Sequence, residues 1–299
     1  MIYDTVIRNA RVVDGQGSAI FQADVAIAAD RIVRISERIT EPAQQIVEAE
    51  GQYLAPGFID VHTHDDLEVI ERPDMLAKIS QGVTTVIVGN CGISASPVVL
   101  ESEPPDPLNL LGERADFVYS GFSDYARAVD RARPSVNVAA LVGHTAIRNN
   151  HLDDLQRSAT DEELAAMQAQ LREALEQGAL GLSSGLAYAS AKKADTEEVL
   201  AMVSELKPFG AVYTTHLRTE FDQIMAAVDE AIVTAGASRV PLIISHLKCA
   251  GKGNWGRSDE VLNRLEQAAK VQKLACDCYP YAASSSTLDL NQVTDESDI

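Results

Sequence analysis

The sequence predicts an α/β protein: a (β/α)8 barrel of the TIM type, preceded by a small β-sandwich domain. After Pro56-Gly57, short apolar runs alternate with longer amphipathic stretches, as strands and helices do around a parallel sheet. These runs extend over about 220 residues, close to the roughly 250 that eight barrel strands take. Before Pro56 the runs are shorter and follow a period of two. We therefore assign residues 1–54 to the N-terminal part of the sandwich and residues 55–299 to barrel strands 1–7.

The N-terminal segment, from Asp4 to about Tyr53, is predicted to be a small antiparallel β unit. Apolar and polar residues alternate in TVIRNARVVDG and ADVAIAADRIVRIS. Gly15-Gln16-Gly17 and Asp30-Arg31 separate the runs and are typical of turns between strands.

Seven apolar runs are the candidate strands of the barrel. They are Gly57–His62, Thr84–Gly89, Val136–Val142, Ala179–Ser184, Ala211–His216, Val240–His246 and Leu274–Tyr279. We expect the barrel to be incomplete at its C-terminal end, because the final residues NQVTDESDI are polar and supply no eighth strand.

Helix signals lie between these strands. Thr160 and Glu163 form a capping box, and the helix that follows is expected to end at Gly178. Asp195 and Ser258 are placed to cap two further helices. A doubly wound open sheet would show the same alternation, but its Gly-rich nucleotide turn is not found after the first strand.

Composition excludes several classes of partner. A net charge of -19 and a pI near 4.6 disfavour binding to nucleic acid or to anionic lipid. No apolar run reaches the roughly 20 residues of a membrane span, and the N-terminus lacks the pattern of a signal peptide. The four cysteines show no secreted disulfide spacing. We expect a soluble cytoplasmic protein.

Metal-binding residue types collect at the predicted strand ends. His62 and His64 are two residues apart and so point the same way at the end of the first strand. Cys91 follows the second strand, and His216 and His246 end two later ones. Barrel enzymes place their active sites at the carboxyl ends of the strands, and zinc favours such a mixture of nitrogen and sulfur. The pattern predicts a zinc centre, with Cys91 able to serve two sites.

Each of these residues has a plainer interpretation when it is taken alone. A His-x-His pair is more often an ordinary polar pair, and a lone cysteine is more often a small buried hydrophobe. The coincidence at four strand ends favours metal ligands. Cys276 and Cys278 lie inside an apolar strand, so we expect them in the core, while Cys249 stays open. His144 ends a strand as either a pocket residue or a structural one.

Several motifs resemble the amidohydrolase superfamily. LAPGFIDVHTHDDL is similar to its first-strand signature, and the N-terminal β unit is similar to its small flanking sandwich. QGVTTVIVGNCGISASP, GALGLSSGLAY, HLR, SHLK with NWGRS, and DCYPYAASSS resemble the N-acyl-D-amino-acid deacylase branch, from about Asp4 to Ser286. In that branch a cysteine stands where most two-metal relatives carry a modified lysine, and Cys91 matches it. The resemblance implies a barrel of the metal-dependent hydrolase kind.

The resemblance also implies a division of the metal ligands. Cys91, His216 and His246 would hold one tightly bound zinc. His62 and His64 would hold a second, weaker metal together with an aspartate of the eighth strand. That aspartate would also be the general base. Because it is expected beyond residue 299, we expect this chain alone to be inactive or nearly so.

The implied substrate is a small N-acyl-D-amino acid, whose N-acyl amide bond is hydrolysed. Lys248 and Tyr279 match positions that bind its α-carboxylate, with Ser285 as a possible helper. A cation at the barrel mouth suits an anionic substrate. Hydrolysis of a cyclic amide and a non-catalytic metal-binding role stay open as alternatives. The sequence does not indicate the acyl group, the side chain of the D-amino acid or the oligomeric state.

Overall fold

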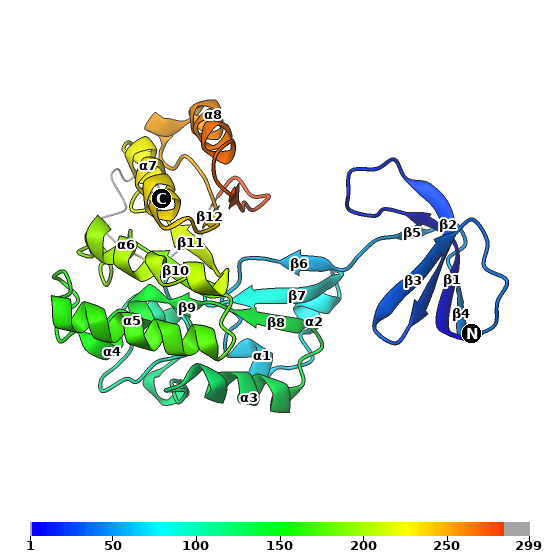
Figure 1. Ribbon diagram of the computed structural model, residues 1–299, viewed down its shortest axis with the longest axis horizontal. Helices are drawn as coiled ribbons and strands as arrows, with labels where there is room; N and C mark the ends of the chain where they lie inside the picture. The colour runs from blue at the N-terminus through cyan, green and yellow to red at the C-terminus, as the bar shows by residue number, and fades with distance from the viewer. Residues whose placement is uncertain (1, 284–299) are drawn as a thin grey trace. The chain divides into compact units, whose positions relative to one another are not determined.

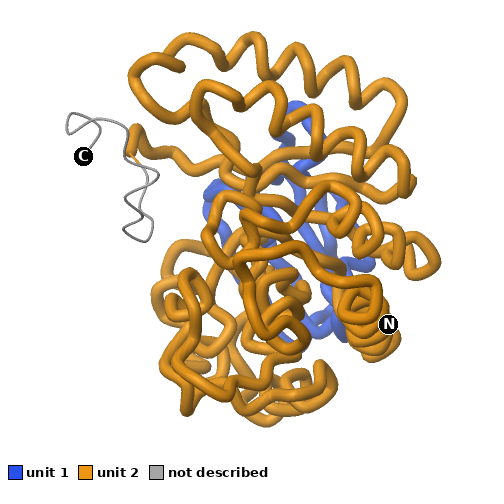
Figure 2. Tube along the Cα trace, turned by 90° about the vertical axis from the view of Figure 1, so that its left-hand side faces the viewer, with its two compact units in different colours: residues 1–58 blue, residues 59–299 orange. Residues whose placement is uncertain are grey.

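The computed structural model describes residues 2–283 of the chain. It divides into two compact units, Met1–Phe58 and Ile59–Ile299 (Figure 2). The division falls just beyond Pro56-Gly57, where the hydrophobic pattern of the sequence changes. The predicted role of Ser285 lies outside the described residues.

The first unit is a single five-stranded sheet with the order β3-β2-β1-β4, in which β5 also pairs with β1. Its strands are β1 (Tyr3–Val12), β2 (Phe21–Ala28), β3 (Arg31–Ser36), β4 (Ala43–Glu48) and β5 (Tyr53–Leu54). The first three strands pair antiparallel, as predicted. The prediction is wrong for β4 and β5, which run parallel to β1. The reason is connectivity: the chain leaves β3 and crosses to the far edge of β1, so β4 enters in the same direction.

All seven predicted strands are present, and all but Phe58, the first residue of β6, lie in the second unit. They are β6 (Phe58–Asp60), β7 (Val83–Val88), β8 (Asn137–Ala140) with β9 (Val142–Gly143), β10 (Gly181–Gly185), β11 (Val212–His216), β12 (Leu242–Ile244) and β13 (Leu274–Cys276). The third predicted strand is divided at Leu141, whose N–H donates to the carbonyl of Val88. The sheets have the orders β6-β7-β8 and β9-β10-β11-β12-β13, and the pairs from β9 to β13 are all parallel.

Helices cover the strands of the second unit (Figure 1). The α-helices are α1 (Glu68–Glu71), α2 (Leu76–Ile79), α3 (Phe122–Ala132), α4 (His144–His151), α5 (Asp161–Glu176), α6 (Thr196–Ser204), α7 (Ile224–Ser238) and α8 (Ser258–Ala269). Short 3-10 helices span Leu108–Leu110, Arg114–Asp116, Lys207–Phe209 and Lys252–Asn254. Among the described helices, none is long and apolar enough to cross a membrane.

Two of the three predicted helix N-caps are confirmed, and the third is displaced by one residue. The Thr160–Glu163 capping box is present at the start of α5, and the Asp195 side chain accepts from the backbone N–H of Glu198. Ser258 is the first residue of α8 rather than its cap, which is Arg257.

The main core lies between the helices and the parallel strands. Its fully buried residues include Leu171, Leu182, Met202, Val228 and Ile244.

Cys276 and Cys278 are exposed, so the prediction that they pack in the core is wrong. Successive residues of an extended chain point to opposite sides. Asp277, which lies between them, turns inward, where its carboxylate meets His62 and the backbone of His246. The two thiols therefore face the other way.

His144 belongs to a buried polar network, which favours the structural interpretation of this residue. Its side chain is 1% exposed, and Nε2 lies 2.9 Å from Oε1 of Glu198. Nη1 of Arg148, which is fully buried, lies 2.5 Å from the same oxygen. Burial alone would raise the pKa of Glu198, but the hydrogen bond and charge of His144 and those of Arg148 lower it to about 2. The network joins α4 to α6.

Glu198→Gln should therefore lower the free energy of unfolding by roughly 3–5 kcal/mol, because Arg148 would stay buried without an anionic partner. The folded-state pKa of Glu198 lies below its ordinary 4.5. Its stabilisation is therefore complete above pH 4.5 and is lost as the pH falls toward 2. Denaturant unfolding at several pH values measures both effects.

Glu260→Gln is the matched control, because it removes an exposed ion pair with Arg257 and should change stability little. Equal losses in the two variants, or an unchanged acid sensitivity in Glu198→Gln, would contradict the assignment.

Candidate metal centre

Five predicted donors meet at the carboxyl ends of four strands. His62 and His64 follow β6, Cys91 follows β7, His216 ends β11, and His246 follows β12. They form two groups, His62–His64–Cys91 and Cys91–His216–His246, and within each group the donor atoms lie within 4.8 Å of one another. Parallel strands bring their carboxyl ends to one edge, which is why residues up to 184 positions apart in sequence can share a site.

Cys91 is the member common to both groups. Its Sγ lies 3.2 Å from Nε2 of His62 and 3.4 Å from Nε2 of His246. The ring centroids of His216 and His246 are 4.4 Å apart, and those of His62 and His246 are 5.1 Å apart. The thiol thus lies between imidazoles from separate strands.

The backbone around Cys91 is unusual and is held by neighbouring strands. Cys91 has a positive φ of 54°, in the left-handed region that non-glycine residues rarely adopt. The Ser183 hydroxyl on β10 accepts from the N–H of Gly92 and donates to the carbonyl of Gly89. The Asp66 carboxylate accepts from the N–H of Gly89 and of Ala95. These bonds fix both sides of the turn that presents the thiol.

The electrostatics of the donors suit a metal ion. Burial, together with nearby His246, lowers the pKa of His216 to about 3. Burial, with the charges of His62 and His246, lowers the pKa of His64 to about 4, even though His64 is exposed at the surface of the described structure. Both imidazoles are therefore neutral at pH 7 and have a lone pair to donate.

Two observations on single atoms support the same fit. Burial, Asp277 and Glu220 raise the pKa of the Cys91 thiol, so its thiolate needs a nearby cation. Nδ1 of His216 is buried without a hydrogen-bond partner among residues 2–283. A divalent cation with nitrogen and sulfur preference would satisfy both groups.

Two carboxylates beside the donors were not found in the sequence. Asp277 follows β13, and its Oδ1 lies 3.2 Å from Nδ1 of His62. Glu220 follows β11, and its Oε1 lies 3.1 Å from Nδ1 of His246. Burial opposes the ionised forms, but hydrogen bonds and electrostatic interactions with the neighbouring histidines, and with Lys248 at Glu220, lower both pKa values. Asp277 had a signal in the alternation of Cys-Asp-Cys, whereas Glu220 lies in a loop without periodicity.

The predicted substrate residues lie beside this cluster. Nζ of Lys248 lies 2.6 Å from Oε2 of Glu220 and 5.7 Å from the ring centroid of Tyr279. The Tyr279 hydroxyl is buried and has no hydrogen-bond partner in the described part of the chain. Lys248 and Tyr279 are therefore neighbours, as a shared carboxylate-binding role requires.

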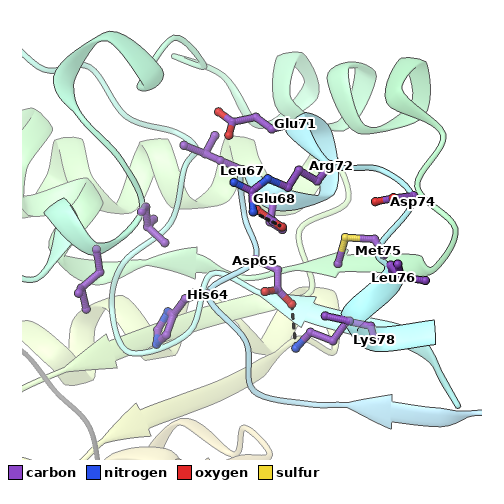
Figure 3. Close-up of a pocket in the computed structure, with 13 residues that line it drawn as sticks. His64, Asp65, Leu67, Glu68, Glu71, Arg72, Asp74, Met75, Leu76 and Lys78 are labelled. Atoms are coloured by element: carbon purple, nitrogen blue, oxygen red, sulfur yellow. Dashed lines mark hydrogen bonds and ion pairs between the residues drawn. The ribbon is translucent and has the colours of Figure 1, made fainter. Parts of the chain in front are cut away.

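A pocket of about 510 Å³ opens next to His64 (Figure 3). Its lining combines apolar residues with two basic ones and with four acidic ones, which are Asp65, Glu68, Glu71 and Asp74. Of the five donors, only His64 lines it. The Asp65–Lys78 ion pair, at 3.0 Å, crosses its wall and fixes the segment that follows His64.

The parallel strands and their helices, with a histidine and cysteine cluster at the strand ends, define an α/β protein with a barrel-like core and a candidate metal centre. The chain belongs to the amidohydrolase family, whose model matches residues 45–295. The sequence resemblance to this family is therefore confirmed.

Individual proteins of the family give a more specific likeness than the family model does. The N-acyl-D-aspartate deacylase of Alcaligenes xylosoxydans xylosoxydans is 43% identical over 290 residues, or 97% of this chain and 58% of that protein. A D-aminoacylase crystal structure matches with a TM-score of 0.92 at 42% identity, covering 95% and 60% of the two chains.

The N-acyl-D-glutamate deacylase of Bordetella bronchiseptica, solved with zinc and a phosphonate mimic of the tetrahedral intermediate, matches with a TM-score of 0.89 at 39% identity. The match covers 94% of this chain and 59% of that one. This chain thus spans about three-fifths of the length of these relatives.

Gly185→Ala should disturb the centre without touching a donor. A Cβ at Gly185 would overlap the carbonyl oxygen of Cys91, and backbone atoms cannot move aside as a flexible side chain can. We expect a loss of roughly 1–3 kcal/mol in unfolding free energy, together with weaker zinc binding. Denaturant unfolding and chelator competition measure the two effects.

Gly236→Ala on α7 provides the control, since its Cβ would meet only the end of the Gln272 side chain, which can rotate away. Normal zinc affinity in Gly185→Ala would show that the close approach does not position Cys91.

Proposed function

We propose that the protein is a zinc-dependent hydrolase that cleaves the N-acyl amide bond of N-acyl-D-amino acids. The observation that carries the proposal is the pair of donor groups that share Cys91, with Lys248 and Tyr279 beside them. Cys91, His216 and His246 would hold the tightly bound ion, and His62 and His64 would contribute to a second, weaker site. When bound, zinc supplies a Lewis acid for the amide carbonyl and activates water at neutral pH.

The chain's own groups would orient the substrate. The Lys248 ammonium can donate charge-assisted hydrogen bonds to the α-carboxylate, and the Tyr279 hydroxyl, buried and unpartnered among the described residues, can donate another. The ring centroid of Tyr188 lies 4.7 Å from that of His216, so Tyr188 borders the same place. Together these groups would hold the amide next to the donors in one orientation.

The relatives support the substrate class. Their names specify N-acyl-D-aspartate, N-acyl-D-glutamate and D-aminoacyl substrates, all of which share an acylated D-amino acid. The shared part of these molecules is the acyl amide beside an α-carboxylate. We therefore assign Lys248 and Tyr279 to that common part and leave the side-chain specificity to other groups.

The proposal extends to architecture and location. We propose that the parallel strands form a (β/α)8 barrel from residue 55 onward, and that residues 1–54 contribute to a β-sandwich. The parallel ladders of β9 to β13 support the barrel. On the sequence grounds given above, the location would be cytoplasmic.

Zinc content tests the centre. Elemental analysis of the purified chain should find about one tightly held zinc per molecule, because three nitrogen and sulfur donors converge there. Cys91→Ala combined with His216→Ala should abolish it. A folded wild-type chain that holds no zinc would refute the metal centre. Cys249→Ala is the control, since Cys249 belongs to neither donor group.

Lys248→Met tests the substrate class. It should weaken binding of an N-acetyl-D-amino acid by about 10–100-fold, because a hydrogen bond to a charged group contributes roughly 1.5–3 kcal/mol. Calorimetric titration of the zinc-loaded chain measures binding separately from turnover. The L enantiomer and the α-amide should bind the wild type more weakly.

Lys252→Met changes an exposed lysine four residues further on, at the start of a 3-10 helix, and should leave binding unchanged. Unchanged affinity in Lys248→Met would favour the alternative in which the substrate is a cyclic amide without a free carboxylate.

A further inference from the structure

Two histidines of the centre share an arrangement. In both His62 and His246, Nε2 faces the Cys91 sulfur, at 3.2 and 3.4 Å. In both, Nδ1 faces a carboxylate on the opposite side: Asp277 for His62, at 3.2 Å, and Glu220 for His246, at 3.1 Å. The two carboxylates come from different loops, after β13 and β11. Each imidazole is thus held between the sulfur and its own carboxylate.

Both carboxylates are largely buried, so their contacts with the histidines replace contacts with water. The side chain of Glu220 is 8% exposed and that of Asp277 is 13% exposed. Carboxylates removed from water need hydrogen-bond donors, and an N–H at Nδ1 is one. A neutral imidazole carries a single proton, so a proton at Nδ1 leaves Nε2 unprotonated and free to bind a metal.

We propose that Asp277 and Glu220 are positioning residues that keep His62 and His246 in the tautomer that presents Nε2 to the metal. The proposal rests on the zinc centre of the proposed function. It assigns each carboxylate to a different donor group: Asp277 to His62–His64–Cys91, and Glu220 to Cys91–His216–His246.

Each carboxylate also makes a second contact. Oδ1 of Asp277 accepts from the backbone N–H of His246, at 2.6 Å, where φ is 35°. Asp277 thereby stabilises a left-handed turn that glycine would adopt more easily. Glu220 accepts from Lys248, whose Nζ also lies 3.1 Å from Nδ1 of His246.

The second contact of Glu220 connects the metal to the substrate residue. Nδ1 of His246 can either accept from Lys248 or donate to Glu220, but it cannot do both. A metal ion at Nε2 requires a proton at Nδ1, and this proton is donated to Glu220. Lys248 then has one acceptor fewer and is freer to bind an anionic substrate. Glu220 therefore connects a metal ligand to the proposed carboxylate-binding lysine.

Zinc affinity in two backgrounds tests the assignment. His64→Ala leaves the Cys91–His216–His246 group intact, and His216→Ala leaves the His62–His64–Cys91 group intact. Affinity is measured on the purified chain by competition with a chromophoric chelator. Outer carboxylate partners of metal-binding histidines typically account for about 10–100-fold in affinity.

Glu220→Gln should therefore weaken zinc binding by about 10–100-fold in the His64→Ala background and by less than about threefold in the His216→Ala background. Asp277→Asn should show the reverse. In asparagine one neutral oxygen stays at the Oδ1 position, where it can still accept from the His246 N–H. The amide NH2 takes the place of Oδ2, 3.4 Å from Nδ1 of His62, and donates instead of accepting, which favours the other tautomer. Asp277→Ala removes both, and should weaken zinc binding in both backgrounds.

Glu205→Gln is the matched control, because it removes a half-buried carboxylate that pairs with Arg172 away from the donors. It should leave zinc affinity unchanged. A second readout needs no variant of the carboxylates: in the zinc-loaded wild type, ¹⁵N NMR of the histidines should show His62 and His246 protonated at Nδ1 and metal-bound at Nε2.

The outcomes separate the two proposals. If the wild type binds zinc and loses it in Cys91→Ala, but Glu220→Gln and Asp277→Asn bind normally, the positioning role is refuted and the metal centre stands. Metal binding through Nδ1 of either histidine would also overturn the positioning role. A wild-type chain that binds no zinc would overturn the metal centre and, with it, this inference.

Discussion

The site depends on one constraint: a buried thiol must lie within reach of imidazoles from both sides. Cys91 meets this constraint only because its backbone adopts a left-handed conformation, between two glycines that also have positive φ. The turn packs so tightly against β10 that a Cβ at Gly185 would overlap the Cys91 carbonyl. Ser183, from the same strand, bonds to both sides of the turn. The left-handed backbone at Cys91 is thus held by hydrogen bonds to the turn on both sides of it and by close packing against β10.

Much of this organisation could be predicted from the sequence. The seven strands were located because each is a short apolar run, and the five donors because they stand where those runs end. That the donors face one another follows from the parallel direction of the strands, which a pattern of alternating strands and helices indicates. The parallel pairing of β4 with β1 was not predictable, since the alternating pattern is the same whichever way a strand enters the sheet.

The failures at the site have a different origin. The sequence predicts Cys276 and Cys278 in the core because cysteine is usually buried, and with that orientation the alternation of an extended chain would point Asp277 outward. The same alternation, with the opposite choice, brings Asp277 to His62. No periodicity constrains the loop that carries Glu220, so only the fold could bring it to His246. His144 also stands at a strand end but does not belong to the donor cluster. It contacts the buried carboxylate of Glu198, so a histidine at a strand end can have a structural role.

Charge balance explains why one cation should be held more tightly than a second. Asp277, Glu220 and a Cys91 thiolate would carry three negative charges, and Lys248 returns one positive charge, which leaves two negative charges in a poorly solvated place. One divalent ion neutralises this excess, and the thiolate becomes favourable where burial alone opposes it. A second divalent ion would leave the same region with two positive charges, so it needs a further anion. The neutral imidazoles His64 and His216 supply lone pairs but no charge. In the proposed centre the donor set would therefore match one ion electrostatically, and a second ion would bind well only beside a substrate or another carboxylate.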